Sequence, residues 1–172
     1  MSFTDFNDTI LIYNSKLDDY SYKQLLIKPS PEEWSIGQVY MHLLNETIYY
    51  MEQANCCLAN DDNAQEKMST TAEIIFKNNS LPRQKIKNDN IDALKMKQPS
   101  SKAQLQKEML QLQGDVNHLS KQVRAGKSRG KTRHPGLGYF NAAEWLQFAA
   151  MHLRHHLNQL QELDAFLKKQ AL

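Results

Sequence analysis

Glycine and proline are scarce in this chain, with six and five residues respectively among 172. These residues are the strongest local markers of turns, and here they gather between long stretches with helical periodicity. A protein built from many short strands would need turn residues at closer intervals. The distribution therefore favours an all-α fold.

Cysteine is equally rare, since Cys56 and Cys57 are the only two and they are adjacent. Neighbouring cysteines rarely form a disulfide with each other, so the sequence offers no disulfide framework. We interpret the pair as small helix residues that partly face a core, in preference to a pair of reactive thiols. A reducing cytoplasm is the location that we expect.

The chain also lacks a strong charge of either sign and any long apolar run. A net charge of +2 provides no long-range field that would attract nucleic acid or a membrane surface. No apolar run reaches the length of a membrane span, and residues 1–6 do not resemble a secretory signal. We therefore expect a single domain over residues 1–172 that meets a small molecule, with no nucleic-acid or membrane partner.

Apolar residues instead recur at three- and four-residue steps, the spacing of amphipathic helices. Possible capping boxes begin at Ser35 and Asn141, each with Gln or Glu three residues later. We expect a long connection near 60–100 with a helical turn or two in 65–76, and a solvated basic loop over 127–133 that leads to His134. The predicted helices span about 4–26, 35–59 after a short turn at 31–34, 101–125, and from 141 onward.

His152 and His156 lie four residues apart on the apolar stripe of the last predicted helix. Positions i and i+4 share one helix face, so both imidazoles can reach one metal ion. His42, in the second predicted helix, is a candidate third ligand, and three histidines would leave a coordination position open for water or substrate. The alternative is that these are surface histidines, or buried ones whose ring nitrogens are satisfied by hydrogen bonds.

Other residues near these histidines have several possible roles. Gln159, one turn beyond His156, is placed to support that ligand. Glu46, one turn beyond His42, is a candidate catalytic base, a further ligand, a supporting group or a solvated surface residue. His155 points about 100° away from His156 on the helix and should not share its ion. His155 and Tyr40 are weaker acid–base candidates.

Two motifs together resemble the DinB-like superfamily. Residues 31–39 (PEEWSIGQV) followed by His42-Leu43 are similar to its second-helix signature, and residues 134–146 (HPGLGYFNAAEWL) followed by 152–159 (HLRHHLNQ) are similar to its last-helix signature. The resemblance implies an up-down-down-up four-helix bundle with a long crossover between helices two and three. It also implies a divalent metal, zinc or nickel, on His42, His152 and His156.

The resemblance further implies a metal-dependent enzyme, either a thiol S-transferase that uses a low-molecular-weight thiol such as bacillithiol, mycothiol or glutathione, or a hydrolase that activates water. The alternative is a non-catalytic metal-binding or stress-response module. A nucleic-acid interface over residues 121–133 is disfavoured, because the net charge is small and no aromatic residues are interleaved. Proteins of this type often pair through helix faces, so we expect a homodimer.

Overall fold

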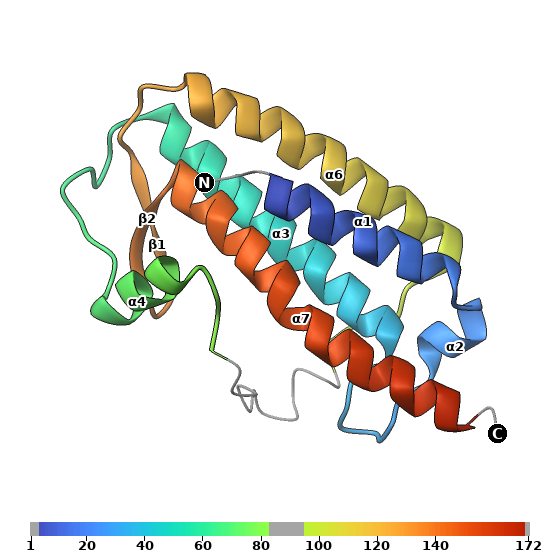
Figure 1. The fold of residues 1–172 in the computed structure, drawn as a ribbon. Coiled ribbons are helices and arrows are strands. Elements are labelled where there is room, and N and C mark those ends of the chain that lie inside the picture. The colour runs from blue at the N-terminus through green and yellow to red at the C-terminus, as the bar shows by residue number, and fades with distance from the viewer. Residues whose placement is uncertain (1–3, 83–94, 171–172) are drawn as a thin grey trace.

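The computed structural model describes residues 4–82 and 95–170 and is mostly helical. Four long helices lie alongside one another in Figure 1: α1 (Thr4–Asp18), α3 (Ile36–Ala59), α6 (Lys102–Ala125) and α7 (Ala142–Gln170). The helix pair α3 and α7 has the most extensive contact in the molecule, and α1 packs on both α6 and α7. None of the described helices is long and apolar enough to cross a membrane.

The first predicted helix is divided in two. α1 ends at Asp18, and a short helix, α2 (Tyr22–Leu26), follows it. Ser21 caps α2, because its side chain accepts from Gln24 N at 3.3 Å while Gln24 Oε1 accepts from Ser21 N at 2.8 Å. Serine at this position offers the backbone a hydrogen bond that competes with a continuous helix. The apolar stripe continues across the break, which is why periodicity alone predicted one helix.

The starts of the two helices that carry the candidate ligands agree with the prediction. Ser35 caps α3 in a reciprocal box with Gln38, with bonds of 3.1 and 3.2 Å. Asn141 and Glu144 form the same reciprocal pair at the start of α7, at 2.7 and 2.9 Å. Each box satisfies backbone N–H groups that a helix start leaves without partners. The first residue of each helix is therefore fixed, and with it the residues that lie on each helix face.

A small antiparallel hairpin replaces part of the expected basic loop. β1 (Lys131–His134) pairs with β2 (Gly138–Asn141) just before α7. Four-residue strands are too short to show a clear alternation in sequence. Gly138 has φ +83° and approaches the chain so closely that a Cβ there would lie 2.8 Å from Lys67 O. The hairpin thus depends on contact with a distant segment, which the local sequence does not reveal.

The expected connection between α3 and α6 contains a further helix, α4 (Thr70–Asn78), with Ser69 as its N-cap. α4 lies beside the hairpin at one end of the bundle (Figure 1). Arg154 Nη2 on α7 donates to Asn79 O at 2.7 Å and ties the end of α4 to the bundle. Residues 83–94 of the predicted connection lie outside the described residues.

The hydrophobic core lies between the long helices. Within it, buried hydrogen bonds connect α1, α3 and α7. Tyr13 of α1 donates from its hydroxyl to Leu153 O of α7 at 2.9 Å. Tyr40 of α3 donates from its hydroxyl to Tyr13 O at 2.7 Å. These bonds satisfy polar atoms that would be costly to bury alone, and they fix α7 next to the position of His152.

Candidate metal centre

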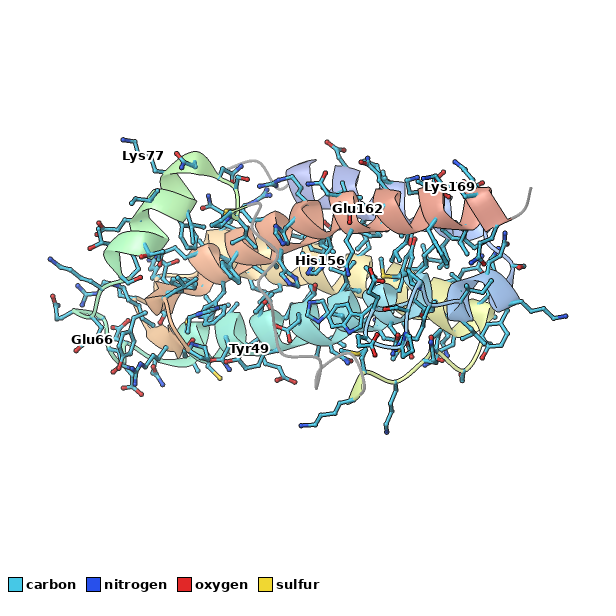
Figure 2. All side chains as sticks on the ribbon, turned by 90° about the horizontal axis from the view of Figure 1, so that it is seen from below. Tyr49, Glu66, Lys77, His156, Glu162 and Lys169 are labelled. Carbon is cyan, nitrogen blue, oxygen red and sulfur yellow. The ribbon has the colours of Figure 1, made fainter. Side chains whose placement is uncertain are left out.

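The three predicted ligands come together from two helices. α3 contributes His42, and α7 contributes His152 and His156 from adjacent turns. Figure 2 shows His156 between the ribbons of α7 and α3. The two helices run in opposite directions, because His42 meets His152 while Tyr50, further along α3, stacks on Trp145 near the start of α7.

The Nε2 atoms of the three imidazoles point toward one another. His152 Nε2 lies 3.2 Å from His42 Nε2 and 3.1 Å from His156 Nε2. The ligand atoms of all three residues lie within 4.8 Å of one another. Tetrahedral zinc with Zn–N bonds of about 2.0–2.1 Å requires nitrogens about 3.3 Å apart. The two measured Nε2–Nε2 distances therefore match edges of a metal tetrahedron.

Hydrogen bonds among the three rings cannot satisfy all three Nε2 atoms, whereas one cation can contact them all. His152 Nε2 has either one proton or one lone pair, so it cannot form a full hydrogen bond with both neighbours. In addition, His152 is only 8% exposed, and its Nδ1 is buried without a hydrogen-bond partner among the described residues. Burying an imidazole in this way is costly unless its other nitrogen makes a strong interaction. The residues present thus fit a metal ion.

Gln159 supports His156 as the sequence predicted. The two side chains are linked by a 2.8 Å bond between His156 Nδ1 and Gln159 Oε1. An amide oxygen only accepts, so Nδ1 carries the proton and donates. The Nε2 lone pair of His156 is then free and directed into the cluster, which is how supporting groups orient metal-binding histidines.

The electrostatic environment keeps the three rings neutral. Burial, with a smaller contribution from the nearby His156, lowers the pKa of His42 to about 3. Burial also lowers the pKa of His156 to about 4, against the opposing effect of its bond to Gln159. The pKa of His152 is held well below its usual value, mainly by burial. Neutral imidazole is the form that binds metal, so the ligands need not lose protons near pH 7.

Aromatic rings cover two sides of the three-histidine cluster. The Trp34 ring centroid lies 4.7 Å from that of His42 and 6.4 Å from that of His156, nearly parallel to the latter at 21°. The ring of Tyr50 is perpendicular to that of His152, at 90°, with the two centroids 5.6 Å apart. Sequence reasoning did not assign either residue to the site. Their signals were available, because Trp34 lies in the second-helix motif and Tyr50 is two turns beyond His42.

Glu46 lies close to the cluster but is not one of its converging ligand groups among the described residues. Its Oε2 accepts a 2.9 Å hydrogen bond from the Tyr50 hydroxyl, and the Tyr50 ring contacts His152. The structure therefore links Glu46 to the site through Tyr50. Among the described residues, its Oε1 atom has no hydrogen-bond partner.

The weaker acid–base candidates are not directed into the cluster. His155 meets the edge of His156 at 5.3 Å and is not among the converging ligands in the described part of the chain. Tyr40 is completely buried and its hydroxyl is bonded to Tyr13 O, and burial raises its pKa well above the usual value. Neither residue is placed to exchange protons with a ligand at the three histidines.

Other residues that the sequence singled out lie elsewhere. His134 is in β1 and packs among aromatic rings, stacked on Trp145 with centroids 5.6 Å apart. Cys56 is exposed and Cys57 is buried, where burial raises the pKa of its thiol. A raised pKa reduces the thiolate fraction, which agrees with the interpretation of Cys57 as a packing residue.

A comparison with protein-family models matches residues 13–160 to the model described as the DinB superfamily. The matched range contains all of α3, α7 as far as residue 160, and the three histidines of the metal centre. A comparison with curated proteins finds no match.

Proposed function

Because this chain belongs to the DinB superfamily, we propose that His42, His152 and His156 hold one divalent metal ion and that the protein is a metal-dependent enzyme. The observation that carries the proposal is the convergence of three imidazoles whose ligand atoms lie within 4.8 Å of one another. Imidazole ligands suit zinc and nickel, which are the metals we favour. Three protein ligands leave a coordination position open, which is typical of a catalytic site.

The reaction class that we propose is activation of a low-molecular-weight thiol or of water for attack on a small molecule. A divalent ion at this site supplies Lewis acidity, which lowers the pKa of such a group. Glu46 is the proposed general base, since Oε2 is held by Tyr50 and Oε1 is available to accept a proton. Gln159 keeps His156 in the tautomer that binds metal, and Trp34 and Tyr50 restrict water around the cluster.

We also propose the up-down-down-up connectivity of the family and a homodimeric, cytoplasmic protein. The connectivity is supported by side-chain bonds between the helices. Asn7 near the start of α1 bonds to Asn117 near the end of α6, so these helices are antiparallel. Tyr13 and Tyr20 of α1 bond to successively later positions on α7, so these two helices are parallel.

The test of metal binding is elemental mass spectrometry of untagged protein. We expect about one divalent ion per wild-type chain, as one three-ligand site implies, and its loss in His42→Ala, His152→Ala and His156→Ala. His118→Ala is the matched control, because His118 is an exposed histidine of α6 outside the cluster, and it should retain the ion. A metal-free wild type that takes up neither zinc nor nickel would contradict the proposal.

Catalysis is tested separately, by assaying thiol transfer to electrophiles and hydrolysis with the metal-loaded protein. We expect Glu46→Gln to keep its metal and to lose about 10²- to 10⁴-fold in rate, the usual contribution of a general base. Metal binding without any rate enhancement would instead identify the protein as a non-catalytic metal-binding module.

A further inference from the structure

Trp34 occupies a position beside the metal centre that the proposed chemistry does not require. It lies in the turn before α3, and its half-buried indole contacts the rings of His42 and His156. A tryptophan that only filled the core would be enclosed, as Trp145 is at 0% exposure. Trp34 instead lies at the boundary between the cluster and solvent.

The burial of the surrounding residues shows the side from which a ligand can enter. Tyr50 and His152 are 4% and 8% exposed, so the cluster is closed on their side. His42, His156 and Trp34 are each half-buried. Exposure therefore increases from His152 toward Trp34. The cluster is therefore partly open to solvent on the side that His42, His156 and Trp34 share.

Hydrogen bonds hold the chain on both sides of Trp34, and the indole contacts two imidazole rings. Lys28 Nζ donates to Pro31 O at 2.6 Å within the preceding turn. Immediately after Trp34, Ser35 and Gln38 form the capping box of α3, and Gln38 Nε2 donates to Met96 O at 2.6 Å. A ring fixed in this way presents a preformed surface and loses little entropy when a ligand binds.

We propose that Trp34 determines ligand specificity at the metal centre by favouring ligands with a flat aromatic group next to an anionic donor atom. The proposal rests on the metal site proposed above. Three neutral imidazoles leave the charge of a divalent ion unbalanced, so the open position favours an anionic donor. The adjacent indole face stacks on a flat ring and gains about 2- to 10-fold in affinity, the range of aromatic pairs.

The test uses Co²⁺-loaded protein and the visible absorption of the ion as the readout. Benzoate, cyclohexanecarboxylate and acetate have the same anionic donor. The first two are of similar size, but only benzoate has a flat aromatic ring. We expect the wild type to bind benzoate about 2- to 10-fold more tightly than cyclohexanecarboxylate. Trp34→Leu should abolish this preference while acetate affinity changes less than about twofold, and Trp34→Phe should keep part of it.

Tyr139→Leu is the control, because it removes an aromatic ring from β2, which leads into the start of α7 (Figure 1), and should leave the preference unchanged. Stoichiometric Co²⁺ uptake and circular dichroism confirm that each variant is folded and loaded. The proposed role of Trp34 would be overturned if Trp34→Leu kept the benzoate preference, or if the wild type showed no such preference. Either result would leave the metal site itself unaffected. Failure of the wild type to bind Co²⁺ would overturn the metal site as well.

Discussion

At the scale of single residues, the hydrogen bond between Gln159 and His156 supports the metal centre. Mutation of Gln159 tests this support directly. We expect Gln159→Leu to weaken zinc binding by about 10- to 100-fold, because His156 Nδ1 loses its acceptor and the ring loses its fixed orientation. Gln159→Glu keeps an acceptor and should bind zinc at least as tightly as the wild type. The affinities can be measured by competition with a chromophoric chelator.

Gln161→Leu is the matched control for this experiment, because Gln161 lies two residues further along α7 on its exposed face. It should bind zinc as the wild type does. Equal affinity in Gln159→Leu and Gln161→Leu would show that the hydrogen bond does not tune the site.

The lowered pKa values predict how the metal-free protein responds to acid. The folded-state pKa is about 3 for His42 and about 4 for His156, whereas both return to about 6.5 when the chain unfolds. Between these values the unfolded chain binds more protons, so the free energy of unfolding increases with pH. The contribution of the two histidines is complete above pH of about 6.5 and is lost as the pH falls toward about 4 and below.

Urea unfolding of the metal-free protein at a series of pH values measures this contribution. The double variant His42→Gln, His156→Gln should show a shallower loss of stability between pH of about 6.5 and 4 than the wild type. The same slope in both proteins would mean that other groups account for the acid sensitivity.

At the scale of helices and strands, the first turn of α3 positions both His42 and Trp34. Gly37 lies in this turn, where an added Cβ would be 2.8 Å from Leu25 O and 2.9 Å from Pro99 side-chain atoms. The close approach packs α2 and the segment before α6 against the start of α3. Space at this position is thus needed to bring three segments together beside the metal centre.

We therefore expect Gly37→Ala to destabilise the protein by about 1–3 kcal/mol, the usual cost of overpacking. Gly114→Ala is the matched control, because Gly114 lies within α6 with nothing within 4 Å of an added Cβ. It should stabilise the helix by about 0.5–1 kcal/mol through the higher helix propensity of alanine. Chemical denaturation gives both values, and destabilisation by both variants would contradict this account.

At the scale of the whole molecule, a metal that joins α3 to α7 should stabilise the fold. Zinc at about 100 times its Kd contributes about 2.7 kcal/mol by mass action, provided that it binds the folded state alone. For a protein of this size that corresponds to a rise in Tm of roughly 5–10 °C. The rise should be absent in the His152→Ala variant, and calorimetry with and without zinc tests it.

Residue identity and spacing were sufficient to predict much of the candidate site. The four-residue interval between His152 and His156 placed both on one helix face, and Gln159 followed from the same periodicity. The capping residues Ser35 and Asn141 marked the starts of α3 and α7 correctly, because a cap depends on atoms only three residues apart. These features are local, which is why the sequence alone could indicate them.

Other features depend on contacts between distant segments, and only the tertiary structure decided them. The hairpin of β1 and β2 forms where Gly138 meets residues near Met68. At the break after α1, Lys102 of α6 donates from its Nζ to the carbonyl oxygens of Asp18 and Tyr20. The sequence by itself determined a helical protein with two histidines on one face. The packing of α3 against α7 brought His42, the predicted third ligand, to the other two histidines, buried the cluster and placed Trp34 beside it. Burial and distance are properties of packed helices rather than of any one of them.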